Sequence, residues 1–268
     1  APGLAKTLAC RTMASACGGT FARVQCNPDL SPAEITGSEI FDPRDLSFHI
    51  RLGPICANVV LADEINRAPA RAQAAFLEAM EERQVTIGSV SHLLPKPFML
   101  LATMNEAEPD GIYALPRAQL DRFLFKVIVD FPERASELEM LELCETRHRQ
   151  AAPVANGSTV LSWQAAVKTI YCAPRLKDHI VSVVCATREA AAGGLLEYGA
   201  GPRASLALLQ AARARAALAQ RSYVLPADVD VSAGDVLRHR IAFSREYSLS
   251  RHQREQRLKK LLEEARIA

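Results

Sequence analysis

NVVLADE, residues 58–64, joins a short apolar run to two adjacent acids. A continuous apolar run of this length, without alternation, is typical of a strand that is buried on both faces of a parallel sheet. FMLLA, residues 98–102, has the same pattern. Between the two runs we expect a helix that starts at Pro69, a residue suited to the first helical turn, and continues to Glu82. A strand, a helix and a second strand at this spacing predict an α/β fold.

Two further segments extend the expected sheet, and a change of character follows them. Residues 20–26 alternate weakly, and residues 125–129 are the fourth expected strand. Beyond Phe131 and Pro132 the strand signals stop, alanine becomes abundant and helical periods follow. The expected helical faces are Leu176, Ile180 and Val184; Leu206, Leu209 and Arg213; and Leu258, Leu261, Leu262 and Ala265. We therefore expect an α/β core at residues 1–134 and a smaller all-helical domain at residues 135–268.

The composition is that of an ordinary globular chain. Of 268 residues, 49% are hydrophobic and 23% charged, which argues against disorder. The net charge of +2 does not call for a nucleic acid or an acidic membrane as partner. The 7 cysteines are scattered without CxxC spacing, as expected for reduced thiols in the cytoplasm. Neither a bilayer-length apolar run nor a secretory signal pattern is present in the sequence, so we expect a cytoplasmic protein.

The chain opens with APGLAKTL, residues 1–8. Lys6 and Thr7 at the start of an expected helix, after a Pro-Gly turn, are typical of a phosphate-binding loop. Backbone N–H groups would hold phosphates, Lys6 would reach the terminal ones, and the Thr7 hydroxyl would bind Mg²⁺. The pattern G-x-x-x-x-G-K-[ST] is only partly met, since Ala5 stands at its second glycine and its first glycine would precede residue 1. An ordinary helix start with an exposed lysine is the alternative.

Asp63 and Glu64 follow an expected buried strand directly. Ligands bind at the carboxyl edge of open α/β sheets. In a nucleotide hydrolase, Asp63 would hold the Mg²⁺ shell while Glu64 orients and deprotonates the attacking water. The alternative is that the two acids cap the next helix, which fits poorly because that helix is expected to start only at Pro69.

Three more polar residues are candidates for the same site. Asn105 follows the strand at 98–102, where its amide would hydrogen-bond the water or the γ-phosphate; a turn asparagine is the alternative. Arg122, in LDRF, stands at a helix end before the fourth expected strand, and a structural salt bridge is its alternative. Arg203 lies in the first turn of an expected helix, where the helix dipole disfavours a cation and a bound phosphate would explain it.

Several stretches closely resemble the MoxR family of AAA+ ATPases. They are residues 53–88 (GPICANVVLADEINRAPARAQAAFLEAMEERQVTIG), 100–123 (LLATMNEAEPDGIYALPRAQLDRF), 201–218 (GPRASLALLQAARARAAL), 223–229 (YVLPADV) and 236–241 (VLRHRI). The resemblance extends from Pro2 to about Ile241, and in this family the loop usually has alanine before the lysine.

The resemblance implies a set of functional residues. It implies a Walker A loop whose nucleotide-binding residues are Pro2, Gly3, Leu4, Ala5, Lys6, Thr7 and Leu8. It further implies Walker B at Asp63 and Glu64, sensor 1 at Asn105, an arginine finger at Arg122 and sensor 2 at Arg203. Residues 27–57 look like the family's insertion in the second core helix, and residues 84–98 look like its hairpin before sensor 1.

The function implied by the resemblance is that of an ATP- and Mg²⁺-dependent motor. Such a subunit would work in a hexameric homo-oligomer as a chaperone that matures or activates other proteins, beside a partner with a von Willebrand type A domain. No strand precedes the loop, so we expect a truncated AAA+ P-loop core with a parallel sheet, from a longer protein. The segment beyond Ser244 matches the family poorly.

Three alternatives stay open at this point. A non-hydrolysing oligomeric scaffold is disfavoured because Glu64 is retained. A nucleic-acid motor should have a basic hairpin, yet Lys96 is the only permanently charged residue in the sequence of residues 84–98. We therefore expect neither a nucleic acid nor a membrane as partner. A magnesium chelatase-like subunit would share the helix insertion.

Overall fold

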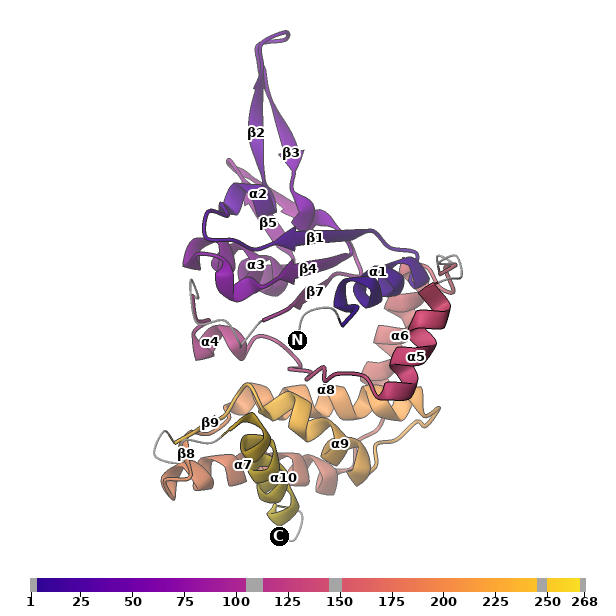
Figure 1. The fold of residues 1–268 in the computed structure, drawn as a ribbon, viewed down its shortest axis with the longest axis vertical. Coiled ribbons are helices and arrows are strands. Elements are labelled where there is room, and N and C mark those ends of the chain that lie inside the picture. Colours follow the sequence, from indigo (N-terminus) through magenta and orange to yellow (C-terminus); the bar gives the residue numbers. More distant parts are fainter. Residues whose placement is uncertain (1–3, 105–112, 145–150, 245–249, 266–268) are drawn as a thin grey trace. The chain divides into compact units, whose positions relative to one another are not determined.

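The computed structural model describes residues 4–104, 113–144, 151–244 and 250–265 (Figure 1). The chain divides into two compact units. Unit 1 comprises Ala1–Leu115 and Val129–Ser162, and unit 2 comprises Pro116–Ile128 and Trp163–Ala268. Each unit therefore takes two separate segments of the chain, and the division expected at residues 134/135 stays a prediction.

The centre of unit 1 is a three-stranded parallel sheet in the order β1-β4-β7. The strands are β1 (Phe21–Gln25), β4 (Val59–Asp63) and β7 (Met99–Ala102). The central strand β4 is buried from Val59 to Ala62, as expected for an apolar run between two neighbouring strands. The register sets Gln25 opposite Asp63 and Ala102 opposite Ala62, so all three strands end at one edge. The strands predicted near residues 20–26, 58–62 and 98–102 are confirmed.

Two helices pack on this sheet. Helix α1 (Lys6–Ala16) contacts β1 and β4, and α3 (Ala70–Glu82) contacts β7. Pro69 is the N-cap of α3, with φ −63° and ψ 156°, so the predicted helix is confirmed with its first residue at Ala70. The fully buried Phe76 supplies the apolar anchor of α3. Helix α5 (Arg134–Cys144) also belongs to unit 1, α4 (Arg117–Leu120) belongs to unit 2, and α6 (Gly157–Thr169) begins in unit 1 and ends in unit 2.

Two antiparallel hairpins complete unit 1. Strands β5 (Gln84–Ile87) and β6 (Val90–Leu93) form one of them. Between α2 (Pro32–Thr36) and the 3₁₀ turn η1 (Pro54–Cys56), β2 (Gly37–Asp42) and β3 (Ser47–Leu52) form the other, which projects from the rest of unit 1 (Figure 1). Across the β2–β3 hairpin, the rings of Phe41 and Phe48 lie 5.3 Å apart, and both side chains are exposed.

The described part of unit 2 is mainly helical and includes a short two-stranded sheet. Its long helices are α7 (Pro174–Ala192), α8 (Pro202–Leu218), α9 (Pro226–Leu237) and α10 (Arg251–Glu264), and β8 (Leu196–Tyr198) pairs with β9 (Ala242–Phe243). The predicted core positions Ile180 and Val184 of α7 and Leu258 of α10 are buried.

The predicted inner face of α8 is wrong at Leu206, which is 63% exposed, whereas Leu209 is partly buried against the core. The helix instead buries a face made mainly of small residues: Ala204, Ala207, Leu208, Ala211, Ala212 and Ala216. Alanines let α8 approach both α7 and α9 closely, and the larger leucine is left on the opposite side.

The predicted fourth strand at residues 125–129 is also wrong. A strand exists through hydrogen bonds to a neighbouring strand, and this segment is not paired with any strand that the structure describes. The Lys126 N–H donates instead to the Asp235 carbonyl oxygen at 2.9 Å, near the end of α9. Residues 125–128 therefore belong to unit 2 rather than to the sheet.

None of the helices in the described part of the chain combines the length and the apolar character needed to cross a membrane.

Candidate active site

Asp63 is the centre of a polar cluster at the carboxyl edge of the parallel sheet. Its Oδ1 accepts a hydrogen bond from Thr103 Oγ1 at 2.5 Å, just beyond β7. Its Oδ2 accepts from Arg23 of β1, at 3.0 Å from Nε and 2.6 Å from Nη2. A side chain of β1 and one from just beyond β7 thus meet at the carboxylate that ends β4, because the three strands are parallel and adjacent.

These contacts keep Asp63 ionised. Partial burial on its own would raise the pKa of the carboxyl group, but the hydrogen bonds from Thr103 and Arg23 and the charges of Arg23 and Lys6 outweigh it, so the pKa lies below its usual value. The same negative charge acts on Cys26, whose pKa is raised to about 12 by burial and by the charges of Asp63 and Glu64. That thiol is therefore neutral and inert at physiological pH.

Glu64 follows Asp63 in an unusual backbone conformation. Its φ of 58° and ψ of 50° lie in the left-handed region, which costs a non-glycine residue about 1–2 kcal/mol. Its N–H donates to Thr103 Oγ1 at 2.8 Å, and the side chain pairs with Arg67 at 3.2 Å. Glu64 precedes the 3₁₀ turn η2 (Ile65–Arg67), but its side chain makes no capping hydrogen bond. The capping alternative therefore does not account for this carboxylate.

The expected phosphate loop leads into α1. Ala5 is the N-cap, with φ 51° and ψ 21°, a left-handed conformation that glycine adopts without strain, which explains why glycine is the standard residue there. Lys6 and Thr7 open the helix, where geometry leaves backbone N–H groups without intrahelical acceptors. Helix α1 contacts β4, and the charge of Lys6 contributes to the lowered pKa of Asp63. Pro2 and Gly3 lie outside the described residues.

The groups at this edge fit a nucleotide with Mg²⁺. An ionised aspartate and a hydroxyl offer the oxygen ligands that Mg²⁺ prefers, in its shell or through water. A lysine and free N–H groups at a helix N-terminus suit phosphate oxygens. Asn105, predicted for the same edge, lies outside the described residues.

The two predicted arginines belong to unit 2. Arg122 is exposed and follows α4, and Arg203 is the second residue of α8. Arg203 Nη1 lies 3.9 Å from Asp121 Oδ2, so the residue before Arg122 links the two predicted positions within this unit.

The similarity of this chain to known proteins extends over most of its length. Residues 1–125 match the ATPase family associated with various cellular activities (AAA), and residues 188–261 match the AAA lid domain. The chain is 43% identical over 249 residues to Chaperone MoxR1 of Mycobacterium tuberculosis, covering 91% of this chain and 66% of that protein. It is 40% identical to YeaC of Bacillus subtilis, covering 90% of this chain and 75% of that one.

The likeness extends to MoxR of Paracoccus denitrificans, at 31% identity over 91% of this chain and 78% of that protein. The chain belongs to the MoxR family of AAA+ ATPases. A crystal structure from Cytophaga hutchinsonii, of a protein described as an ATPase, superposes with a TM-score of 0.90 at 36% identity, covering 98% of this chain and 82% of that one. AAA ATPases bind nucleotide, usually with Mg²⁺, and typically form oligomers, and MoxR proteins work with partners.

Sequence reasoning missed two arginines of this MoxR-family chain. Arg23 lies within β1. The sequence signal that could have identified it is a cation inside a weakly alternating segment that is expected to form a strand. Arg240 has a side chain only 2% exposed and pairs with Asp121 at 2.8 Å. Its guanidinium also donates to the carbonyl oxygens of Phe123 at 2.6 Å and Leu124 at 3.1 Å. It thereby fixes the segment that carries Arg122 to unit 2.

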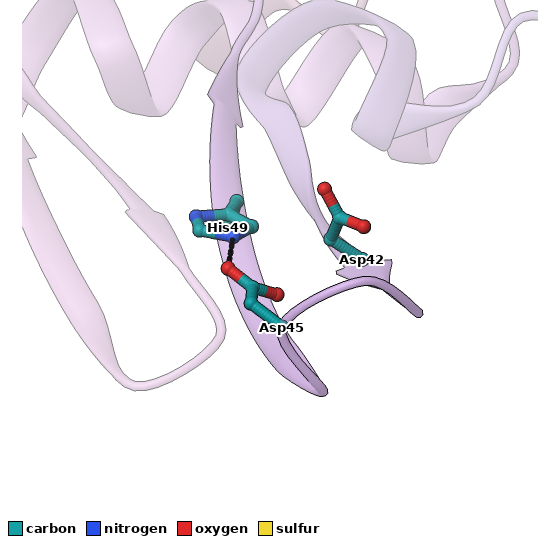
Figure 2. Close-up of side chains that lie close together, drawn as sticks. All are labelled: Asp42, Asp45 and His49. Carbon is teal, nitrogen blue, oxygen red and sulfur yellow. Dashed lines mark hydrogen bonds and ion pairs between the residues drawn. The ribbon is translucent and has the colours of Figure 1, made fainter.

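A second polar cluster of the MoxR-family chain lies on the β2–β3 hairpin, where Figure 2 shows Asp42, Asp45 and His49. Their ligand atoms lie within 4.8 Å of one another. His49 Nε2 is 2.7 Å from Asp45 Oδ2, a contact that lowers the pKa of Asp45 together with bonds from Ser47. Asp42 Oδ1 accepts from the Arg44 N–H, and Asp45 Oδ1 accepts from the Ser47 N–H. These hydrogen bonds close the turn between β2 and β3, and this role accounts for the proximity of Asp42, Asp45 and His49.

Proposed function

We propose that this chain hydrolyses ATP at the carboxyl edge of the β1-β4-β7 sheet and uses the reaction to act on partner proteins. The observation that carries the proposal is the convergence of Asp63, Glu64 and the start of α1 at this edge. Asp63 feels the charge of Lys6, and Glu64 is held beside Asp63 by a hydrogen bond to Thr103.

Each residue has a distinct part in this proposal. Lys6 and the N–H groups that open α1 bind the phosphates, while Thr7 and Asp63 hold Mg²⁺. The metal ion neutralises phosphate charge when it is bound. Glu64, 28% exposed at its side chain, can reach a water molecule and accept its proton once it leaves Arg67.

The test compares two substitutions in the full-length protein. Glu64→Gln should keep ATP binding and slow turnover at least about a hundredfold, since a positioned general base contributes roughly 10²–10⁴ in rate. Lys6→Ala should weaken ATP binding itself. Glu78→Gln makes the same chemical change on the exposed side of α3 and should leave both quantities unchanged.

The measurements are steady-state phosphate release and equilibrium binding of a fluorescent ATP analogue. Normal turnover in Glu64→Gln would assign the proton transfer elsewhere. Tight binding without turnover in the unsubstituted protein would favour the non-hydrolysing scaffold instead.

Assembly and partner are a further part of the proposal. Membership of the family supports a hexameric ring and a partner protein with a von Willebrand type A domain. It also supports a cytoplasmic location for this protein. Sedimentation velocity with ATP should show a species of six subunits, and the partner domain should change the ATPase rate. A monomer under all nucleotide conditions would contradict the ring.

A further inference from the structure

Thr103 makes hydrogen bonds to four consecutive residues of the neighbouring chain segment. Its N–H donates to the Ala62 carbonyl at 3.0 Å, and its carbonyl accepts from the Ile65 N–H at 3.0 Å. Between these two bonds its hydroxyl contacts both acidic residues, Asp63 through the carboxylate and Glu64 through the backbone. One side chain is therefore bonded to both proposed Walker B positions.

The direction of these hydrogen bonds follows from chemistry. A threonine hydroxyl has one proton to donate and lone pairs to accept. The Glu64 N–H can only donate, so it must bond to a lone pair of Oγ1. An ionised carboxylate can only accept, so the hydroxyl proton points to Asp63 Oδ1. The Thr103 hydroxyl thus has one orientation, and it fixes one oxygen of Asp63 in turn.

The backbone of Glu64 needs such support. Left-handed conformations of non-glycine residues persist where the surrounding structure over-determines them. Here the N–H groups on both sides of the Glu64 Cα, its own and that of Ile65, are bonded to Thr103. These two hydrogen bonds fix the backbone of Glu64 and therefore the direction in which its side chain leaves the Cα atom.

We propose that Thr103 is a positioning residue for both carboxylates: it orients Asp63 toward the metal shell and holds the backbone of Glu64 in place for proton transfer. The inference rests on the proposed ATPase function. Thr103 acts through Asp63 and Glu64 and needs no contact with the nucleotide.

The deciding comparison is between Thr103→Val, which keeps the β-branched shape without the hydroxyl, and Thr103→Ser, which keeps the hydroxyl. Loss of an outer contact to a metal ligand typically costs 10–100-fold, so we expect Thr103→Val to lower kcat by about that factor, with a much smaller change in KM for ATP. We expect Thr103→Ser to retain most of the wild-type kcat. Thr86→Val, on the exposed β5–β6 hairpin, is the matched control and should behave as wild type.

A second readout does not depend on turnover. Mn²⁺ binding, followed by electron paramagnetic resonance with a non-hydrolysable ATP analogue, should be about tenfold weaker in Thr103→Val and near normal in Thr103→Ser. Wild-type kcat and Mn²⁺ affinity in Thr103→Val would overturn the proposal. Equal losses in the Val and Ser variants would also overturn it, because shape rather than the hydroxyl would then matter.

Failure of the ATPase function itself gives a different result. In that case Glu64→Gln leaves any phosphate release unchanged, whereas the Mn²⁺ titration still reports whether Thr103 orients Asp63. A melting temperature for each variant separates loss of folding from loss of positioning: a Thr103→Val protein that is folded yet impaired supports the proposal.

Discussion

His239 is a buried imidazole in unit 2, and one of its two ring nitrogens is hydrogen-bonded. Its Nε2 lies 2.9 Å from the Phe123 carbonyl oxygen, which requires the proton on that nitrogen. Nδ1 is buried and has no hydrogen-bond partner among the residues that the structure describes. Burial, with a smaller contribution from the charge of Arg240, lowers the pKa of His239 from 6.5 to about 4, against the opposing effect of the bond to Phe123.

The lowered pKa predicts a pH dependence of stability. Between pH 6.5 and about 4 the unfolded state binds the proton and the folded state does not, so the free energy of unfolding falls as the pH falls through this window. The full effect is about 3 kcal/mol, from about 1.4 kcal/mol for each unit of pKa difference. Urea denaturation of wild type and His239→Gln at pH 4 to 7 measures it.

The glutamine keeps a donor for Phe123 but cannot titrate, so the pH slope should flatten in His239→Gln. His252→Gln, on the exposed side of α10, should keep the wild-type slope. An unchanged slope in His239→Gln would show that other groups cause the acid sensitivity.

At this scale, the sequence predicted which acids stand at the sheet edge but not what holds them. Asp63 and Glu64 could be located because their position depends only on the apolar run directly before them. Arg23 and Thr103 each lie 40 residues from Asp63, and their contacts depend on the pairing of β4 with β1 and β7. A local pattern contains no information on that register.

Among the elements, the β2–β3 hairpin depends on close backbone contact at its base. A Cβ on Gly37, whose φ is 106°, would lie 2.2 Å from the Arg51 carbonyl oxygen and 2.7 Å from the Gly53 nitrogen. Both neighbours are backbone atoms, so they cannot move aside as a flexible side chain could. Gly37 is therefore required by space as well as by conformation.

Gly37→Ala should destabilise unit 1 by about 3 kcal/mol or more, the sum of a strained φ and an overpacked contact. Gly194→Ala is the matched control: its φ is 81°, but nothing lies within 4 Å of the new Cβ. Strain alone then costs about 1–2 kcal/mol. Chemical denaturation of each variant against wild type provides the comparison, and equal losses would refute a steric role for Gly37.

Helices and strands that are specified by residues close to one another in the sequence could be predicted. Those that depend on contacts with distant residues of the chain could not. The apolar runs of β4 and β7 and the Pro69 start of α3 specify structure within a few residues. Residues 125–129 are also mostly apolar, but the Lys126 N–H donates to the Asp235 carbonyl oxygen near the end of α9, more than a hundred residues later in the chain. The inner face of α8 was misread because close helix packing selected alanines over Leu206.

For the whole molecule, the proposed ring makes a prediction about Arg122. Such a residue, offered from a neighbouring subunit, neutralises charge developing on the transferred phosphoryl group and contributes roughly 10³–10⁵ in rate. Arg122→Ala and Glu64→Gln should each be nearly inactive alone. When the two are mixed, some interfaces combine an intact Glu64 with an intact Arg122, and ATPase activity should reappear.

Sedimentation of differently labelled variants verifies that subunits exchange. A mixture that stays inactive although mixed rings form would show that Arg122 does not act between subunits. A lower melting temperature of Arg122→Ala would point instead to a structural salt bridge.

Arg240 ties residues 121–124 to the helical unit through Asp121, Phe123 and Leu124. The arginine proposed to serve the neighbour's nucleotide is thus mounted on the same body as Arg203, the residue proposed to sense the subunit's own. A rotation of unit 2 would therefore displace Arg122 together with Arg203, without a change in the conformation of residues 121–124. In a ring of such subunits, one subunit's nucleotide state would pass to the next as a mechanical displacement.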